Sequence, residues 1–397
     1  MDTPISLDLN LMPYITFPPA LRIWRRSILI LVSVLALATH ANAQFTLDSE
    51  GLTGQHSAVA IGQDDLPIIA FQSANALKVI HCLTSDCATF EVSDLTAIAI
   101  SANEISIAIR TDGRPMIALQ SNSSLAVELV DCADAICSTA TTRSLANSGR
   151  YPDIAIRDDG RPIIAFHRSA DRMAAIYDCS DQSCSDGIVR ILDAPLSSAG
   201  SLGTFPSIAI GSGLPIISYV EGFPNNRLIV FRCADVNCAT GAATVAGSSA
   251  NSFTQLVVPA DGRPLIGYYS GTQLQLLDCL DIDCLQTTQR SLDVSLAGAN
   301  LSIALNANGL AVMSYYDAAA RDLKTYQCFD IRCASGKPDR VDQPGEVGEF
   351  TSIALRPGEG PIISYFDGGN GDLKVYPCPD QGCAIQIFDD GFEGLTP

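Results

Sequence analysis

Fourteen cysteines fall into seven pairs, and every pair has the same C-x4-C spacing. Successive first cysteines lie 50, 47, 54, 46, 49 and 50 residues apart, and no cysteine stands outside the pattern. A fixed period of this length is typical of a chain built from one repeated unit. The sequence therefore predicts seven copies of one unit, whose pairs are Cys82/Cys87, Cys132/Cys137, Cys179/Cys184, Cys233/Cys238, Cys279/Cys284, Cys328/Cys333 and Cys378/Cys383.

Each unit repeats the same order of short segments. In the third unit an apolar run at 154–156 is followed by the turn Asp159-Gly160, a second apolar run at 162–166 and a third run that leads into the cysteines. A more polar segment leaves the cysteines. Asp-Gly between apolar runs predicts a hairpin, because Gly adopts positive φ without steric cost. Four strands of about 5 or 6 residues and loops of about 4 to 6 fill roughly 45 residues, which leaves no room for a helix.

The inner runs are almost continuously apolar, which indicates that both faces of each sheet are covered. Seven sheets packed face to face around an axis satisfy this condition. The predicted fold is therefore all-β, a seven-bladed β-propeller of four-stranded antiparallel blades. A solenoid is the alternative, but its periods are usually shorter. Two segments compete for the closing strand of the last blade: residues 45–49, which we prefer, and residues 385–389.

The N-terminal region carries the marks of an export signal. Arg22, Arg25 and Arg26 precede the apolar run 28–38, and small residues follow at Ala41 and Ala43. This pattern predicts a cleavable signal peptide; an uncleaved anchor is the alternative, although a membrane span needs about 20 apolar residues. We expect residues 1–43 to be an N-terminal extension with its signal peptide, 44–390 a single propeller and 391–397 a C-terminal tail. The mature protein is then secreted or periplasmic, with no membrane span.

In an exported chain, paired cysteines predict disulfides. The C-x4-C spacing places both cysteines at the hairpin between the third and fourth strands, so we expect one bridge per blade. Zinc binding by the cysteine pairs is the alternative, but a closed zinc site needs four ligands and each pair offers two.

An acidic residue recurs inside six of the seven cysteine loops. Its side chain is either a calcium ligand or, more simply, an acceptor of hydrogen bonds from nearby backbone amides. We predict the second role. The residues are Asp134, Asp181, Asp235, Asp281, Asp330 and Asp380, with Thr84 in the first unit.

The net charge and the absence of several catalytic motifs exclude some classes of partner and of catalysis. With 43 acidic and 24 basic residues the net charge is -19, so nucleic acid and acidic membranes are poor partners. The sequence contains no Gly-x-Ser-x-Gly elbow, no phosphate-binding Gly-rich loop and no His cluster with metal-ligand spacing. We therefore expect no cofactor, no bound metal and no nucleophilic catalysis.

In a propeller, the loops between second and third strands share one face with the connections between blades. On that face His167 is the only histidine that we retain as a site candidate; His56 aligns with Tyr151, Phe205, Phe253 and Phe350 and is predicted to pack. The candidate binding residues are His167, Arg168, Arg172, Glu221, Tyr269, Tyr316, Asp317, Arg321, Phe366 and Asp367.

The repeat resembles a known group of proteins. Ser352-Ile353-Ala354-Leu355, the stretch from Gly360 to Asp367 and the stretch from Asn370 to Lys374 are similar to the repeat of secreted bacterial propeller proteins, loosely related to sialidase-like propellers. The resemblance implies the fold and export, and most members of the group have no assigned activity. The sialidase Asp box is matched only in part, by Arg157-Asp158-Asp159-Gly160.

These observations predict an exported, monomeric, non-enzymatic binding or scaffold module. Its loop face is expected to engage an extracellular glycan or protein. A glycan-processing, sialidase-like hydrolase that uses acidic residues and Tyr on the same face is the alternative. The sequence does not separate binding from a purely structural role in the cell envelope.

Overall fold

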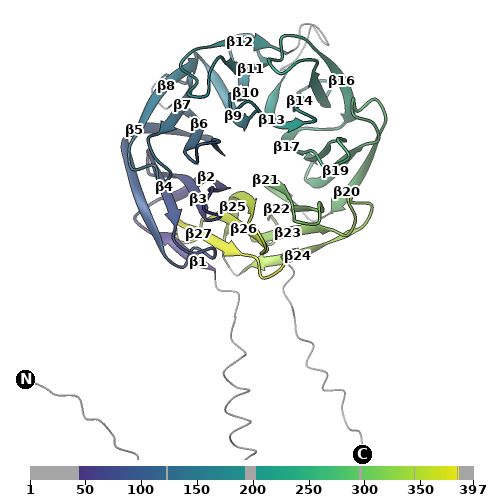
Figure 1. Ribbon diagram of the computed structural model, residues 1–397. Helices are drawn as coiled ribbons and strands as arrows, with labels where there is room; N and C mark the ends of the chain where they lie inside the picture. Colours follow the sequence, from purple (N-terminus) through teal and green to yellow (C-terminus); the bar gives the residue numbers. More distant parts are fainter. Residues whose placement is uncertain are drawn as a thin grey trace, which may run out of the picture. The chain divides into compact units, whose positions relative to one another are not determined.

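The computed structural model describes residues 44–121, 124–192, 203–294, 297–343, 345–381 and 383. The predicted signal, residues 385–389 and the C-terminal tail lie outside the described residues. The described chain forms seven four-stranded antiparallel blades around a central axis (Figure 1), as the cysteine period predicts. None of the described residues belongs to a helix that could cross a membrane.

The first two blades share one continuous strand. This strand, β5, ends blade 1 and then begins blade 2. The strands of the first three blades are β2 (Thr53–Ile61), β3 (Pro67–Ser73), β4 (Ala76–Cys82) and β5 (Phe90–Ile109); then β6 (Pro115–Ser121), β7 (Val127–Cys132) and β8 (Ala140–Ala146); then β9 (Gly149–Ile156), β10 (Pro162–Arg168), β11 (Met173–Cys179) and β12 (Gly187–Ile191).

The remaining four blades repeat the same order from the axis outward. Their strands are β13 (Thr204–Gly211), β14 (Leu214–Glu221), β15 (Arg227–Cys233) and β16 (Gly241–Ser248); β17 (Ser252–Val257), β18 (Leu265–Ser270), β19 (Gln273–Cys279) and β20 (Thr287–Asp293); β21 (Ala297–Leu305), β22 (Ala311–Asp317), β23 (Asp322–Cys328) and β24 (Gly336–Asp342); and β25 (Val347–Leu355), β26 (Pro361–Asp367), β27 (Asp372–Pro377) and β1 (Phe45–Asp48).

The core lies between the blades. The second strands are buried along almost their whole length; every residue of β3, β6, β22 and β26 is buried. The fourth strands are the most exposed, as β8 and β24 illustrate. This gradient follows from the packing of each sheet between two others, because the outermost strand alone meets solvent along one edge.

The N-terminal strand closes the ring. β1 pairs antiparallel with β27, with Phe45 opposite Val375 and Thr46 opposite Lys374. Leu47 packs in the apolar cluster between blade 7 and blade 1, and the Asp48 carboxylate lies 2.9 Å from Nζ of Lys78 in blade 1. The preferred closing segment is thus confirmed.

The prediction of one disulfide per blade is confirmed. The paired Cα atoms lie 4.6 to 4.8 Å apart, and none of the described cysteines is free. The bridges join Cys82 to Cys87, Cys132 to Cys137, Cys179 to Cys184, Cys233 to Cys238, Cys279 to Cys284, Cys328 to Cys333 and Cys378 to Cys383.

The second cysteine of each bridge lies in the left-handed region of the backbone. Its φ is between 53° and 62° in Cys87, Cys137, Cys184, Cys238, Cys284, Cys333 and Cys383. The sequence did not indicate this conformation, because the residue is not glycine. It follows from the tight loop, in which the amide of the second cysteine donates to the carbonyl three residues earlier, as Cys333 does to Asp330 at 2.9 Å.

The carboxylates of the cysteine loops accept backbone amides, as predicted. Asp330, for example, accepts the amides of Arg332, Ala334 and Ser335 at 3.0, 3.0 and 3.1 Å. In blade 1, the Thr84 hydroxyl accepts the amide of Thr89 at 3.3 Å. These side chains hold the loop closed beside its disulfide.

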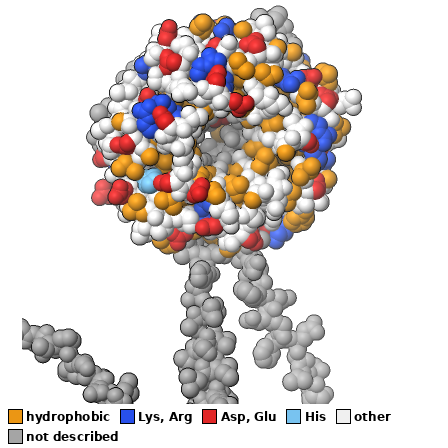
Figure 2. All heavy atoms as spheres, in the orientation of Figure 1, with side chains coloured by type: hydrophobic (Ala, Val, Ile, Leu, Met, Phe, Trp, Pro, Cys, Tyr) orange, Lys and Arg blue, Asp and Glu red, His pale blue; other side chains and the backbone are white. Residues whose placement is uncertain are grey.

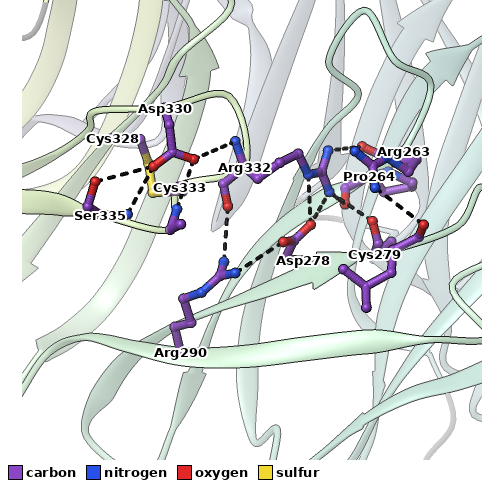
Figure 3. A network of polar contacts seen from close by, with 12 residues as sticks. Arg263, Pro264, Asp278, Cys279, Arg290, Cys328, Asp330, Arg332, Cys333 and Ser335 are labelled. Carbon is purple, nitrogen blue, oxygen red and sulfur yellow. Dashed lines mark hydrogen bonds and ion pairs between the residues drawn. A yellow bond between two sulfur atoms is a disulfide. The ribbon is translucent and has the colours of Figure 1, made fainter.

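Polar contacts between blades stabilise the cysteine side of the ring. Arg332, in the cysteine loop of blade 6, reaches into blade 5 (Figure 3). Its Nε donates to Asp278 at 2.9 Å and its Nη2 to the Cys279 carbonyl at 2.9 Å. In blade 3, Arg157 makes the equivalent contacts with Asp178 and Cys179 from within its own blade. Arg356 donates in the same way to the Cys378 carbonyl of blade 7, at 2.7 Å. A guanidinium therefore occupies the same place in blades 3, 5 and 7, although in blade 5 it comes from a different position of the repeat.

Candidate binding face

The first strand of each blade is distorted where it begins. In β13, β17 and β25 the pairing register shifts next to one residue. That residue has positive φ in six blades, between 43° and 76°, although it is never glycine. Left-handed backbone is strained in residues with bulky side chains, and such strain tends to collect at functional sites. The residues are His56, Tyr151, Phe205, Phe253, Asn300 and Phe350.

Five of these side chains are rings, which we call the aromatic collar: His56, Tyr151, Phe205, Phe253 and Phe350. The ring centroids of Tyr151 and Phe205 are 4.3 Å apart, and those of Phe205 and Phe253 are 4.5 Å apart. On another part of the ring His56 and Phe350 are 4.1 Å apart. Phe205 and Phe253 also line the mouth of the central channel. The collar therefore consists of two groups of contacting rings, and Phe205 and Phe253 of the larger group line the central channel.

The collar is exposed on one side and supported on the other. Tyr151, Phe205, Phe253 and Phe350 are partly exposed, whereas His56 is buried. Burial lowers the pKa of His56 to about 4, so this ring is neutral at pH 7. The prediction that His56 packs is confirmed.

Neighbouring blades hold the strained backbone in place. The hydroxyl of Thr254 donates to the Phe205 carbonyl at 2.8 Å, and the hydroxyl of Ser57 donates to the Phe350 carbonyl at 3.2 Å. These contacts hold the backbone of Phe205 and Phe350 in its left-handed conformation.

Below the collar, the central channel has a volume of about 240 Å³ and is lined by the first strands of the blades. Serine hydroxyls join one blade to the next there. Ser207 accepts the amide of Leu256, Ser302 accepts that of Ile353 and Ser352 accepts that of Val59, at 3.1 to 3.2 Å.

Asp153 replaces serine at this position in blade 3. Its carboxylate accepts the Ser106 hydroxyl at 2.7 Å and the Ile208 amide at 2.8 Å. Burial nevertheless raises the pKa of Asp153 above its usual range. Of the described residues that line the channel, Asp153 is the only one with an ionisable side chain.

A second depression, which we call the blade-3 hollow, adjoins the collar at Tyr151. It has a volume of about 320 Å³. Its lining comes from the start of β9, the end of β10, the loop after β10 and the start of β13. The lining residues are Arg150, Tyr151, His167, Ser169, Arg172 and Thr204.

Two of the predicted binding residues, His167 and Arg172, meet in this hollow. Their neighbour Arg168 pairs with Asp171 at 3.4 Å. Two others, Tyr269 and Phe366, are buried behind the collar, against Phe253 and Phe350 respectively. They support the exposed rings and do not themselves face solvent.

The other predicted residues lie in the loops of blades 4, 6 and 7. Glu221 is fully buried and accepts Asn225 Nδ2 at 2.7 Å. Asp317 accepts the amides of Ala319 and Ala320, and Asp367 accepts that of Asn370. Tyr316 is buried. Arg321 is exposed and lies 3.9 Å from Glu346.

The sequence prediction therefore passed over several residues that form the collar or line the blade-3 hollow: Arg150, Tyr151, Phe205, Phe253 and Phe350. A signal was present, because a bulky ring recurs at one position of the repeat. That signal alone does not distinguish a buried packing position from an exposed collar.

The space-filling view of one face shows the central hollow, with positive, negative and apolar side chains interspersed around it (Figure 2). Within the described ranges no group of three or more His, Cys, Asp or Glu side chains is arranged to hold a metal ion. We take the collar and the blade-3 hollow of the described chain as the candidate binding face.

Known proteins resemble this chain in fold. No protein-family model matches the sequence, and no curated protein matches it. Virginiamycin B lyase from Staphylococcus aureus matches with TM-score 0.54 and 12% identity, over 84% of this chain and 97% of that chain. A mutant of AofleA from Arthrobotrys oligospora matches with TM-score 0.51 and 9% identity, over 76% of this chain and 90% of that chain. At these identities the likeness shows the fold alone.

Proposed function

We propose that this protein is a non-enzymatic binding module that engages an extracellular glycan through the aromatic collar. The observation that carries the proposal is the recurrence of a strained ring at one position of five blades, partly exposed in four of them. Strain at equivalent positions persists only where the surrounding structure enforces it. Two of these rings, Phe205 and Phe253, line the central channel.

Ring faces suit the apolar faces of sugar units. An aromatic side chain offers a large flat contact, at little cost in conformational entropy because it has two rotatable bonds. Three rings in mutual contact, Tyr151, Phe205 and Phe253, form a continuous surface whose planes are tilted by 35° and 37°. Polar groups nearby, such as Asn300 and Gln255, supply hydrogen-bonding capacity at the same opening.

The expected export supports the choice of an extracellular ligand. The seven disulfides fit an oxidising compartment, and the N-terminal sequence predicts a signal peptide.

A glycan array with the Phe205→Ala/Phe253→Ala double variant tests the proposal. We expect the wild-type protein to bind at least one class of polysaccharide, and the double variant to bind it at least tenfold more weakly. The matched control is Phe329→Ala, because Phe329 is 53% exposed but lies in the cysteine loop of blade 6, on the opposite face. An array with no binding, or equal loss in the control, would contradict the proposal. Turnover of fluorogenic glycosides would favour the hydrolase alternative instead.

A further inference from the structure

The blade-3 hollow collects positive charge in a protein that is otherwise strongly acidic. The described residues contain 17 arginines. Fourteen of them lie within 4.0 Å of a carboxylate. The three others are Arg143, Arg150 and Arg172, and Arg143 donates to the Cys184 carbonyl.

Arg150 and Arg172 are thus the two arginines of the described chain that have neither a carboxylate nor a carbonyl partner there, and both line the same hollow. No Asp or Glu is among its described lining residues. Both side chains are exposed. Two guanidinium groups that share a concave site without an anion raise the local potential, and they match the planar geometry of an oxyanion.

The hollow is continuous with the collar through Tyr151. This ring lines the hollow and also contacts the Phe205 ring, with the centroids 4.3 Å apart. The hydroxyl-bearing residues Ser169 and Thr204 complete the lining. A ring face, hydroxyl groups and two cations side by side correspond to the three parts of an acidic sugar: its apolar face, its hydroxyls and its charged substituent.

We infer that the blade-3 hollow binds the oxyanion substituent, a carboxylate or a sulfate, of an acidic polysaccharide whose sugar rings lie on the collar. This inference rests on the proposed function and names its substrate class. The negative charge of the rest of the protein opposes binding of a polyanion, but at physiological salt this repulsion is largely screened beyond about 8 Å, while the two arginines would contact the ligand directly.

The repeat supplies a matched control. Arg172 and Arg321 occupy the same place before the third strand of their blades, with φ of 61° in both. Arg321 is also exposed, but it faces Glu346 at 3.9 Å. Asn226 holds this position in blade 4 with φ of 47°, so asparagine is compatible with the left-handed backbone. Arg172→Asn and Arg321→Asn therefore make the same chemical change, the first in the blade-3 hollow and the second outside it.

The experiment measures binding to immobilised polygalacturonate, dextran sulfate and neutral dextran, by calorimetry or interferometry at about 0.15 M salt. We expect the wild-type protein to bind polygalacturonate, dextran sulfate or both, and to bind neutral dextran at least tenfold more weakly. Binding to polygalacturonate alone would identify a carboxylate as the recognised group. Binding to dextran sulfate alone would identify a sulfate. Arg150→Ala/Arg172→Asn should weaken this binding at least tenfold, and Arg321→Asn less than twofold.

Other outcomes overturn the inference. If neutral polysaccharides bind as well as acidic ones and only Phe205→Ala/Phe253→Ala loses binding, the collar proposal stands and the oxyanion site is wrong. If Arg321→Asn weakens binding as much as the hollow variant, the attraction is general and not local. If no polysaccharide binds, both proposals fail. Thermal unfolding of each variant shows whether a loss reflects misfolding, which is unexpected at the exposed positions Arg150, Arg172 and Arg321.

Discussion

Asp153 stands where four other blades have serine: Ser106, Ser207, Ser302 and Ser352. Serine accepts an amide of the next blade without any charge to desolvate. Asp153 makes the same contact with the Ile208 amide but carries a carboxylate in the channel wall. Its raised pKa means that the folded protein binds a proton at this site more tightly than the unfolded chain does.

This difference predicts how stability depends on pH. The contribution of Asp153 is fully favourable below the pKa of the unfolded chain, near about 3.9, and is lost as the pH rises through the higher folded value. Asp153→Ser should therefore increase the free energy of unfolding at pH 7. The gain should shrink toward pH 4.

Urea unfolding at pH 4 and pH 7 measures this effect. Asp153→Ala is the control, because it removes the charge and also the acceptor of the Ile208 amide, so its gain should be smaller. A serine variant that is less stable than wild type at pH 7 would refute the argument.

The cysteine hairpin is the element that repeats most strictly. Each loop combines a disulfide, a left-handed second cysteine and a side chain that accepts backbone amides. Asp235 accepts amides of Asn237, Ala239 and Thr240 at 3.0 to 3.1 Å. The hydrogen bond from Ala239 outweighs desolvation and, with those from Thr240, lowers the pKa of Asp235. The charged form is therefore favoured in the folded loop.

Asp235→Ala should lower the free energy of unfolding by about 1 kcal/mol at pH 7, a small value because solvent screens this exposed loop. Since the folded pKa is depressed, the contribution is present above the unfolded pKa and disappears as the pH falls through the folded value. Guanidinium unfolding at pH 7 and pH 3 measures both effects. Asp235→Thr, which copies Thr84 of blade 1, should retain part of the stability. If Asp235→Ala and Asp235→Thr lower the free energy of unfolding equally, the side chain at this position does not stabilise the loop by accepting backbone amides.

For the whole molecule, closure of the ring depends on one short strand from the opposite end of the chain. β1 supplies the fourth strand of blade 7, and Leu47 fills the apolar cluster between blades 7 and 1. Leu47→Asp should lower the free energy of unfolding by at least about 3 kcal/mol, because it removes a buried side chain and buries an unpaired charge.

Leu52→Asp is the control for Leu47→Asp, since Leu52 is 60% exposed and lies just beyond β1. It should change stability by less than about 0.5 kcal/mol. Thermal unfolding and limited proteolysis compare the two. If both variants melt at the wild-type temperature, β1 does not close the ring.

The fold was largely predictable from the sequence. The repeat follows from the seven C-x4-C pairs, and the hairpins follow from Asp-Gly turns such as Asp159-Gly160. The apolar second strands indicate that both faces of each sheet are covered. These local features recur in successive units, so the pattern remains recognisable even where one unit departs from it. The acceptance of amides by residues such as Asp235 was predictable for the same reason.

The candidate binding face was anticipated only in part, because it is assembled between blades. Periodicity placed His167 and Arg172 on one face, where both line the blade-3 hollow, but it did not show that Arg150 joins them from the preceding strand. Nor did it show that Tyr269 lies behind Phe253. Which ring faces solvent depends on the bulge at the start of each first strand and on hydroxyl groups that hold this bulge from the neighbouring blade.

The sequence alone determined the repeat and its disulfides, because these depend on residues close together in the chain. Only the tertiary structure decided the collar, the hollow and the closing strand, because they depend on contacts between distant segments.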